Sequence, residues 1–298
     1  MLNIDRVLKS NRLMLALTGM QLHEFLKLLA TFEKIFLATC CSKTRKRVFG
    51  GGRKGVLRNA QMKLFYSLLY LKIYPTYDVA SFIFGVDRSR CCRWTQKFFP
   101  ILSQALHREL VLPKRRVRSV EEFTRLCPEA KDLFLDGTER PTQKPSAKQG
   151  KKYSGKKHCH TRKNSIISTE DRKIVFLSPT KSGRLHDFKQ VIKANVLRYL
   201  PSNVSLWVDK GFVGIGEQVR NDTKILIPHK KPKGGSLSVE QKEENKIISS
   251  IRMTVEHAIG GMKRFAATSH IYRNKKGQDD NFAELAAGLW NLHLKATQ

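Results

Sequence analysis

Two short apolar segments, each ending in an aspartate, constrain the fold of this chain more than any other feature. Residues 133–135 lead into Asp136, and residues 204–208 lead into Asp209. Apolar runs this short are typical of buried β-strands. Two such strand ends, with a helix packed across them, can bring acidic side chains together. The sequence therefore predicts a buried sheet that presents carboxylates where its strands end.

A third carboxylate lies on a predicted long helix. Ser238 and Gln241 have the spacing of a capping box, and the helix is expected to run to about residue 265. Arg252, Glu256 and Lys263 are four and seven residues apart, so they share one face of this helix. Taken alone, the face is either a solvated set of ion pairs or part of a site that handles anions.

The first part of the chain reads as helical, with helices expected at residues 13–39 and 57–74. A helix, a turn at Gly85 and a second helix capped by Asp87 follow, within about residues 75–98. Four polar residues crowd the first turns of the second helix: Arg88, Ser89, Arg90 and Arg93. This pattern is typical of a DNA-binding helix-turn-helix. A generic helical hairpin is the alternative.

A basic, proline-started segment at residues 113–118 marks the expected domain boundary. We expect a helical DNA-binding domain at residues 1–118 and a second domain at 119–298. Further strands are expected at residues 161–167, 173–177 and 225–228, and further helices at 186–199 and 281–295. The second domain is therefore predicted to be an α/β domain.

The charge of the chain points to a polyanion as partner. The 298 residues include 56 Lys or Arg and 25 Asp or Glu, which gives a net charge of +31. Two basic loops stand out, one containing Arg53 and Lys54 and the other Lys156 and Lys157. The first is either a plain linker or an arm along DNA phosphates. An anionic membrane is a weaker alternative, because we find no basic amphipathic helix with a clean apolar face.

Targeting features are not evident. No apolar run reaches transmembrane length, and the N-terminus does not resemble a signal peptide. The six cysteines match neither a zinc-site spacing nor a secreted disulfide framework. We expect a cytoplasmic protein with reduced thiols and no membrane partner.

Three acids brought together would repel one another unless a cation neutralises them. Asp136, Asp209 and Glu256 offer the oxygen ligands that Mg²⁺ prefers. Two such ions, about 3.5–4 Å apart, would activate a water or hydroxyl and stabilise the leaving oxygen of a phosphodiester. Mn²⁺ is an expected substitute for Mg²⁺.

At this point the sequence resembles a known family, the DDE-superfamily insertion-sequence transposases of the IS-five type. The resemblance covers nearly the whole chain, in the order of the family's motifs. The matching stretches lie at residues 50–54, 74–78, 84–86, 136–141, 153–157, 160–161, 186–187, 209–212, 228–232 and 255–261. The long helix also resembles the wider IS-four-like Tyr-x2-Arg-x3-Glu-x6-Lys signature, with Ser249 at the position of the tyrosine.

The resemblance implies a fold, a site and a function. The fold is an RNase H-like mixed sheet flanked by helices, preceded by an all-α helix-turn-helix domain. Asp136, Asp209 and Glu256 are implied to be the DDE triad that binds two Mg²⁺, with Arg252 and Lys263 facing DNA. The protein is implied to bind the inverted repeats at the ends of its element, cut them and transfer the 3′-OH to target DNA. A homodimer on DNA is expected, because two ends must be joined.

Some features stay open at the level of sequence. His186-Asp187 matches a family motif, but helix capping by Asp187 explains it equally well. Gly260-Gly261 predicts close backbone packing, because glycines inside a helix cost about 1 kcal/mol each. Two competing functions also remain: a domesticated DNA-binding regulator that does not cut, and an RNase H-like nuclease without strand transfer.

Overall fold

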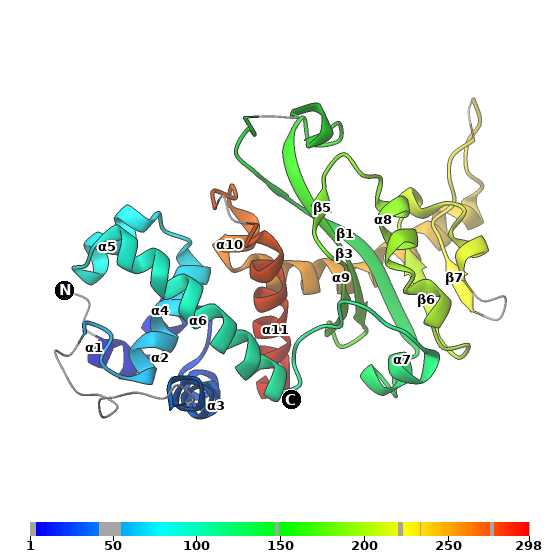
Figure 1. The fold of residues 1–298 in the computed structure, drawn as a ribbon. Helices are drawn as coiled ribbons and strands as arrows, with labels where there is room; N and C mark the ends of the chain where they lie inside the picture. Colours follow the sequence, from blue (N-terminus) through cyan, green and yellow to red (C-terminus); the bar gives the residue numbers. More distant parts are fainter. Residues whose placement is uncertain are drawn as a thin grey trace. The chain divides into compact units, whose positions relative to one another are not determined.

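The computed structural model describes residues 4–41, 55–146, 149–219, 223–232, 234–274 and 277–297. The chain forms two compact units, which we describe separately (Figure 1). Unit 1 comprises Met1–Leu112, Lys263–His270 and Asn281–Gln298. Unit 2 comprises Pro113–Met262 and Ile271–Asp280.

All the regular secondary structure described in unit 1 is helical. Its helices are α1 (Ile4–Leu8), α2 (Asn11–Thr18), α3 (Leu22–Cys41), α4 (Ala60–Ile73), α5 (Tyr77–Phe84), α6 (Arg88–Arg108), α10 (Ala266–Ser269) and most of α11 (Asp279–Thr297). The single helix expected at residues 13–39 is in fact two, because Gly19 ends α2 with φ 75°. A Cβ at Gly19 would also lie 2.9 Å from the Phe265 ring. Gly19 therefore combines a left-handed conformation with a close approach, which favour glycine.

An aromatic cluster explains why the last helix belongs to unit 1. Phe282 of α11 packs edge-on against Phe99 and Tyr74, with ring centroids 5.6 and 5.8 Å apart. The expected division after residue 118 thus differs from the compact units, which divide after Leu112 and return the last helix to unit 1. Aromatic packing between segments far apart in sequence is not visible in local periodicity.

The helix-turn-helix forms as expected, with one difference in length. Gly85 adopts φ 61° between α5 and α6. Trp94 packs edge-on against Tyr66 at 5.2 Å. The predicted second helix ends near residue 98, whereas α6 continues through Pro100 to Arg108.

Unit 2 contains a mixed sheet. Its strands are β1 (Asp132–Pro141), β2 (Tyr153–Ser154), β3 (Cys159–Thr169), β4 (Ile174–Leu177), β5 (Lys181–Ser182), β6 (Ser205–Val208) and β7 (Lys224–Leu226). The order is β2-β3-β1-β6-β7, and β4 and β5 also pair with β3. β3 is antiparallel to β1, whereas β6 and β7 continue the sheet in parallel.

Helices flank both faces of this sheet. The described helices of unit 2 are α7 (Val120–Leu126), α8 (Asp187–Ala194) and α9 (Val239–Lys263), with short 3-10 turns at Gln149–Lys151, Leu197–Tyr199, Lys210–Phe212 and Ile215–Gln218. Leu135 of β1 packs in one core with Val191 of α8. Successive side chains of a strand point to opposite faces of the sheet. The next residue, Asp136, therefore points to the other face, where its carboxylate contacts Arg252 of α9. This is the RNase H-like α/β arrangement that the sequence predicts (Figure 1).

Among the described residues, no single helix is long and apolar enough to cross a membrane. One pair of consecutive helices, Asn11–Thr18 and Leu22–Thr39, has together the length and composition of a membrane span, but the two are bent by 62° relative to one another.

Candidate active site

Strand register brings Asp136 and Asp209 to the same place. Leu135 of β1 pairs with Val208 of the parallel strand β6, and each aspartate is the next residue along the chain. Asp209 follows the last residue of β6 as predicted, but the prediction that Asp136 ends its strand is wrong, because pairing with β3 extends β1 to Pro141. Local backbone groups fix both carboxylates. The Gly137 N–H donates to Asp136 Oδ1 at 2.7 Å, and the Lys210 N–H donates to Asp209 Oδ1 at 2.7 Å.

Arg252 of α9 reaches both carboxylates. Its Nη1 lies 3.2 Å from Asp209 Oδ1, and its Nη2 lies 3.8 Å from Asp136 Oδ2. Burial raises the pKa of Asp136, while the Gly137 N–H and the Arg252 charge oppose that rise. The two aspartates therefore converge on one cationic group, and their oxygens form a hard donor set that suits a divalent cation.

Glu256, the third predicted acid, stands apart from this pair. It lies one turn after Arg252 on α9 and is exposed to solvent. Within the residues that the structure describes, no group of three or more His, Cys, Asp or Glu side chains is arranged to hold a metal ion. The structure thus brings Asp136 and Asp209 together and leaves Glu256 outside their cluster.

A second charged cluster lies against the backbone of Gly137. Lys163 of β3 is buried, and its Nζ lies 2.9 Å from Asp187 Oδ1 and 3.3 Å from Glu139 Oε1. A Cβ at Gly137 would lie 3.0 Å from the same Asp187 oxygen. His186 occupies the N-cap of α8 and makes no side-chain cap bond. Asp187 therefore pairs with Lys163 and is not the N-cap residue.

Sequence reasoning missed Glu139 and Lys163. They are directly opposite one another in the β1–β3 register, which only strand pairing reveals. Lys163 lies at a buried position of β3, but the strand expected at residues 133–135 stops short of Glu139, so local periodicity could not pair the two residues.

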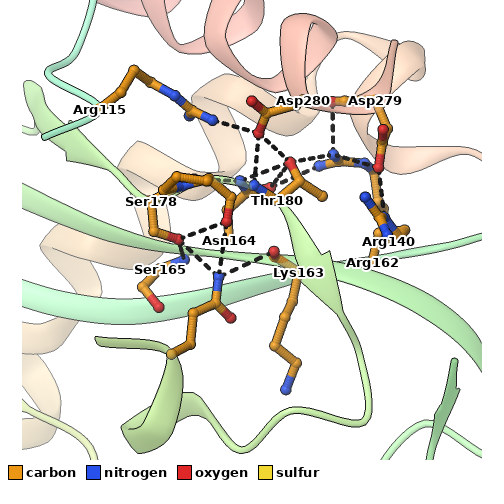
Figure 2. A network of polar contacts seen from close by, with 12 residues as sticks. Arg115, Arg140, Arg162, Lys163, Asn164, Ser165, Ser178, Thr180, Asp279 and Asp280 are labelled. Atoms are coloured by element: carbon orange, nitrogen blue, oxygen red, sulfur yellow. Dashed lines mark hydrogen bonds and ion pairs between the residues drawn. The ribbon is translucent and has the colours of Figure 1, made fainter. Parts of the chain in front are cut away.

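A buried polar network extends from β1 to the start of α11 (Figure 2). Arg140 is only 2% exposed and donates to Asn164 Oδ1, Thr180 Oγ1 and the Asp279 carbonyl at 3.0, 3.2 and 2.7 Å. The Asp279 carboxylate lies 3.8 Å from Arg140 Nη2 and 2.7 Å from Arg162 Nε. Burial lowers the pKa of Arg140 to about 10, so this guanidinium remains charged at neutral pH.

Six of the residues predicted to contact DNA are exposed, whereas Arg252 and Lys263 are not. They comprise Arg88, Ser89, Arg90 and Arg93 in the first turns of α6, and Lys156 and Lys157 between β2 and β3. Arg88 also forms an ion pair with Asp78 at 3.7 Å. Lys263 is half-buried at the end of α9. Arg53 and Lys54 lie outside the described residues.

A basic cavity of about 770 Å³ adjoins the second helix of the helix-turn-helix. Arg90, Arg93 and Lys97 of α6 line it, together with Lys63 and the Trp94 ring. Asp87 occupies the N-cap position of α6 as predicted, without a side-chain cap bond. The first half of α6 thus presents a cationic surface with an aromatic component.

The glycine pair of α9 only partly meets its prediction. Gly261 is buried, but Gly260 is exposed, and a Cβ placed there would meet nothing within 4 Å. The prediction of close packing is therefore wrong for Gly260. Ser249, which stands where the family signature has tyrosine, is exposed.

A helix-turn-helix unit and an RNase H-like sheet with paired aspartates define the class of a DNA-processing protein. Residues 135–291 match the model of the DDE superfamily endonuclease, and residues 56–107 match the helix-turn-helix of DDE superfamily endonuclease. The chain is 30% identical over 229 residues to a probable transposase for insertion sequence element IS702 from Microchaete diplosiphon, covering 76% of this chain and 77% of that protein. No solved structure matches the chain.

The chain belongs to the DDE-superfamily insertion-sequence transposases.

Proposed function

We propose that this protein binds the terminal inverted repeats of its insertion sequence, cuts the DNA there and joins the freed 3′-OH to target DNA. The observation that carries this proposal is the convergence of Asp136 and Asp209, from neighbouring parallel strands, on a single cationic group. The family's endonuclease and helix-turn-helix models support the same chemistry.

Asp136 and Asp209 would hold the metal through the carboxylate oxygens that now face Arg252. Glu256 would be the third ligand, after its exposed side chain turns toward the aspartates. When bound, two Mg²⁺ ions would activate the attacking water or 3′-OH and stabilise the leaving oxygen. The backbone N–H groups of Gly137 and Lys210 hold the two aspartates in place throughout.

Exposed basic residues would hold the DNA. Arg88, Ser89, Arg90 and Arg93 would enter the major groove or contact its phosphates, as in other helix-turn-helix proteins. Lys156, Lys157, Arg53, Lys54 and Lys263 would contact backbone phosphates. The reaction joins two DNA ends, so we infer a homodimer on DNA, acting at the chromosome of a prokaryotic-type cell.

The direct test is a cleavage and joining assay. Purified full-length protein is incubated with Mg²⁺ or Mn²⁺, a duplex that carries the repeats flanking its gene, and a target plasmid. Asp209→Asn and Glu256→Gln should abolish both nicking and joining while DNA binding persists. Asp171→Asn and Glu243→Gln are matched controls, because both residues are exposed and neither lies in the site.

The products separate the competing functions. Binding without cleavage, unchanged by Asp209→Asn, would favour a domesticated regulator. Cleavage without any joined product would favour a nuclease that lacks strand transfer. Equal loss of activity in Asp209→Asn and Asp171→Asn would remove the case for a specific catalytic aspartate.

A further inference from the structure

Arg252 occupies the position between the two carboxylates that the proposed reaction assigns to metal. Its Nη1 lies 3.2 Å from Asp209 Oδ1, and its Nη2 lies 3.8 Å from Asp136 Oδ2. Asp136 Oδ1 accepts from the Gly137 N–H, which leaves Asp136 Oδ2, the oxygen that faces Arg252, for a cation. Asp209 Oδ1 accepts from both the Lys210 N–H and Arg252. A metal ion bound at Asp136 Oδ2 and shared with Asp209 would therefore compete with this guanidinium.

The Arg252 guanidinium makes few hydrogen bonds for a group with so little exposure to solvent. Its side chain is only 16% exposed, yet it donates one hydrogen bond, to Asp209, and its contact with Asp136 is longer than a hydrogen bond. Its Nε is buried and has no partner among the described residues. Arg140 in the same unit donates three hydrogen bonds. A half-buried guanidinium with an unpaired Nε is costly to keep in place.

A divalent cation and Arg252 exclude one another at these oxygens. Mg²⁺ binds carboxylate oxygens at about 2.0–2.1 Å, so an ion on Asp136 Oδ2 would take the place of the Arg252 guanidinium in front of that oxygen. The two positive charges would also repel each other in this half-buried setting. Arg252 must leave before the aspartates can share an ion.

A DNA phosphate is the partner best suited to receive Arg252. Guanidinium groups bind phosphate through two parallel hydrogen bonds, which replaces the single bond made here. Arg252 lies on the helix face that also carries exposed Glu256, beside the two aspartates where DNA would be cut. Transfer of Arg252 to phosphate would free both aspartates at the moment when DNA is present.

We propose that Arg252 and a divalent cation are alternative partners of Asp136 and Asp209, so that DNA promotes metal binding by drawing Arg252 away. This inference rests on the proposed function, in which the two aspartates hold the metal. By linkage, metal and DNA should each strengthen the binding of the other by the same factor. This exchange would prevent the two aspartates from binding metal in the absence of DNA.

The test measures Mn²⁺ binding to the full-length protein by electron paramagnetic resonance, without DNA and without turnover. Arg252→Gln should bind Mn²⁺ at least about fivefold more tightly than the wild type, the lower end of common coupling factors. Lys246→Gln is the matched control, since it removes one exposed positive charge from the same helix, and it should change affinity far less. Asp209→Asn should weaken binding in every background.

A second measurement uses the wild type alone, in case Arg252→Gln does not fold. A short repeat duplex should raise the Mn²⁺ affinity of the wild type, and Mn²⁺ should raise its affinity for the duplex by an equal factor. In folded Arg252→Gln, checked by circular dichroism and melting, the duplex should add little further affinity.

The outcomes distinguish failure of the Arg252 exchange from failure of the proposed metal site. If Asp209→Asn weakens Mn²⁺ binding but Arg252→Gln binds it equally or less tightly than the wild type, the metal site stands and the exchange is overturned. Absence of any linkage between duplex and Mn²⁺ in the wild type also overturns the exchange. If Asp209→Asn leaves Mn²⁺ binding unchanged, both the exchange and the proposed metal site fail.

Discussion

Replacing Asp279 with asparagine should destabilise unit 2 by about 3 kcal/mol, because it leaves buried positive charge without its partner. The Asp279 side chain is only 3% exposed and lies between the guanidinium groups of Arg140 and Arg162. Breaking a buried ion pair costs about 3–5 kcal/mol, and the lower value applies here for two reasons. Arg140 keeps its three hydrogen bonds, and Arg162 is 31% exposed and can reach water.

The expected loss is large enough to measure by calorimetry. For domains of 150–250 residues, a change of 1 kcal/mol shifts Tm by about 2–4 °C, so Asp279→Asn should lower the Tm of unit 2 by about 6–12 °C. Asp171→Asn makes the same chemical change in an exposed turn and should shift the free energy of unfolding by less than about 0.5 kcal/mol.

A double mutant identifies the cause of that loss. Arg140→Met in the Asp279→Asn background removes a buried charge that has lost its partner, so the double mutant should be more stable than the sum of the two single changes predicts. Equal melting of Asp279→Asn and Asp171→Asn would refute the argument from buried charge. Simple additivity of the two substitutions would refute the pairing of Arg140 with Asp279.

Three further predictions concern other parts of the molecule. Gly137→Ala should cost about 1–2 kcal/mol, because the new Cβ would lie 3.0 Å from Asp187 Oδ1. In thermal melts its double mutant with Asp187→Ala should be more stable than the sum of the two single changes predicts. Burial raises the pKa of Cys127 to about 11, so roughly one thiol in a thousand is ionised at pH 8. Its iodoacetamide labelling, followed by mass spectrometry, should therefore rise about tenfold per pH unit from 8 to 9, and labelling that is flat with pH would contradict the assignment. Arg93→Gln should lower the slope of log affinity against log salt by about 0.9 if Arg93 contacts one phosphate, whereas an unchanged slope with altered sequence preference would indicate a base contact.

Local patterns predicted the elements of the site better than their assembly. Residues 133–135 and 204–208 are short and apolar enough to identify two buried strands. Asp209 follows the last residue of its strand as predicted, whereas Asp136 lies inside β1, which continues to Pro141. The capping box at Ser238 and Gln241 predicted the start of α9, and both of its hydrogen bonds form at 3.2 Å.

What sequence could not supply depends on packing and register. The orientation of Arg252 toward the aspartates arises from how α9 crosses the sheet, which helical spacing leaves undetermined. The pairing of Lys163 with Glu139 requires the β1–β3 register. Phe282 joins the last helix to unit 1 through aromatic contacts with residues almost two hundred positions earlier in the chain.

The pairing of Leu135 with Val208 makes the spacing of the two aspartates independent of everything that lies between them in the chain. Asp136 and Asp209 are 73 positions apart in sequence (209 − 136), yet neighbouring strands hold them about 4.8 Å apart in backbone spacing. Insertions or deletions in the loops between them can accumulate during evolution without moving either carboxylate. A shift of one residue in strand register, by contrast, would turn one of them to the opposite face of the sheet. Relatives with very different loop lengths can therefore keep the same pair of acids, and they are best compared strand by strand.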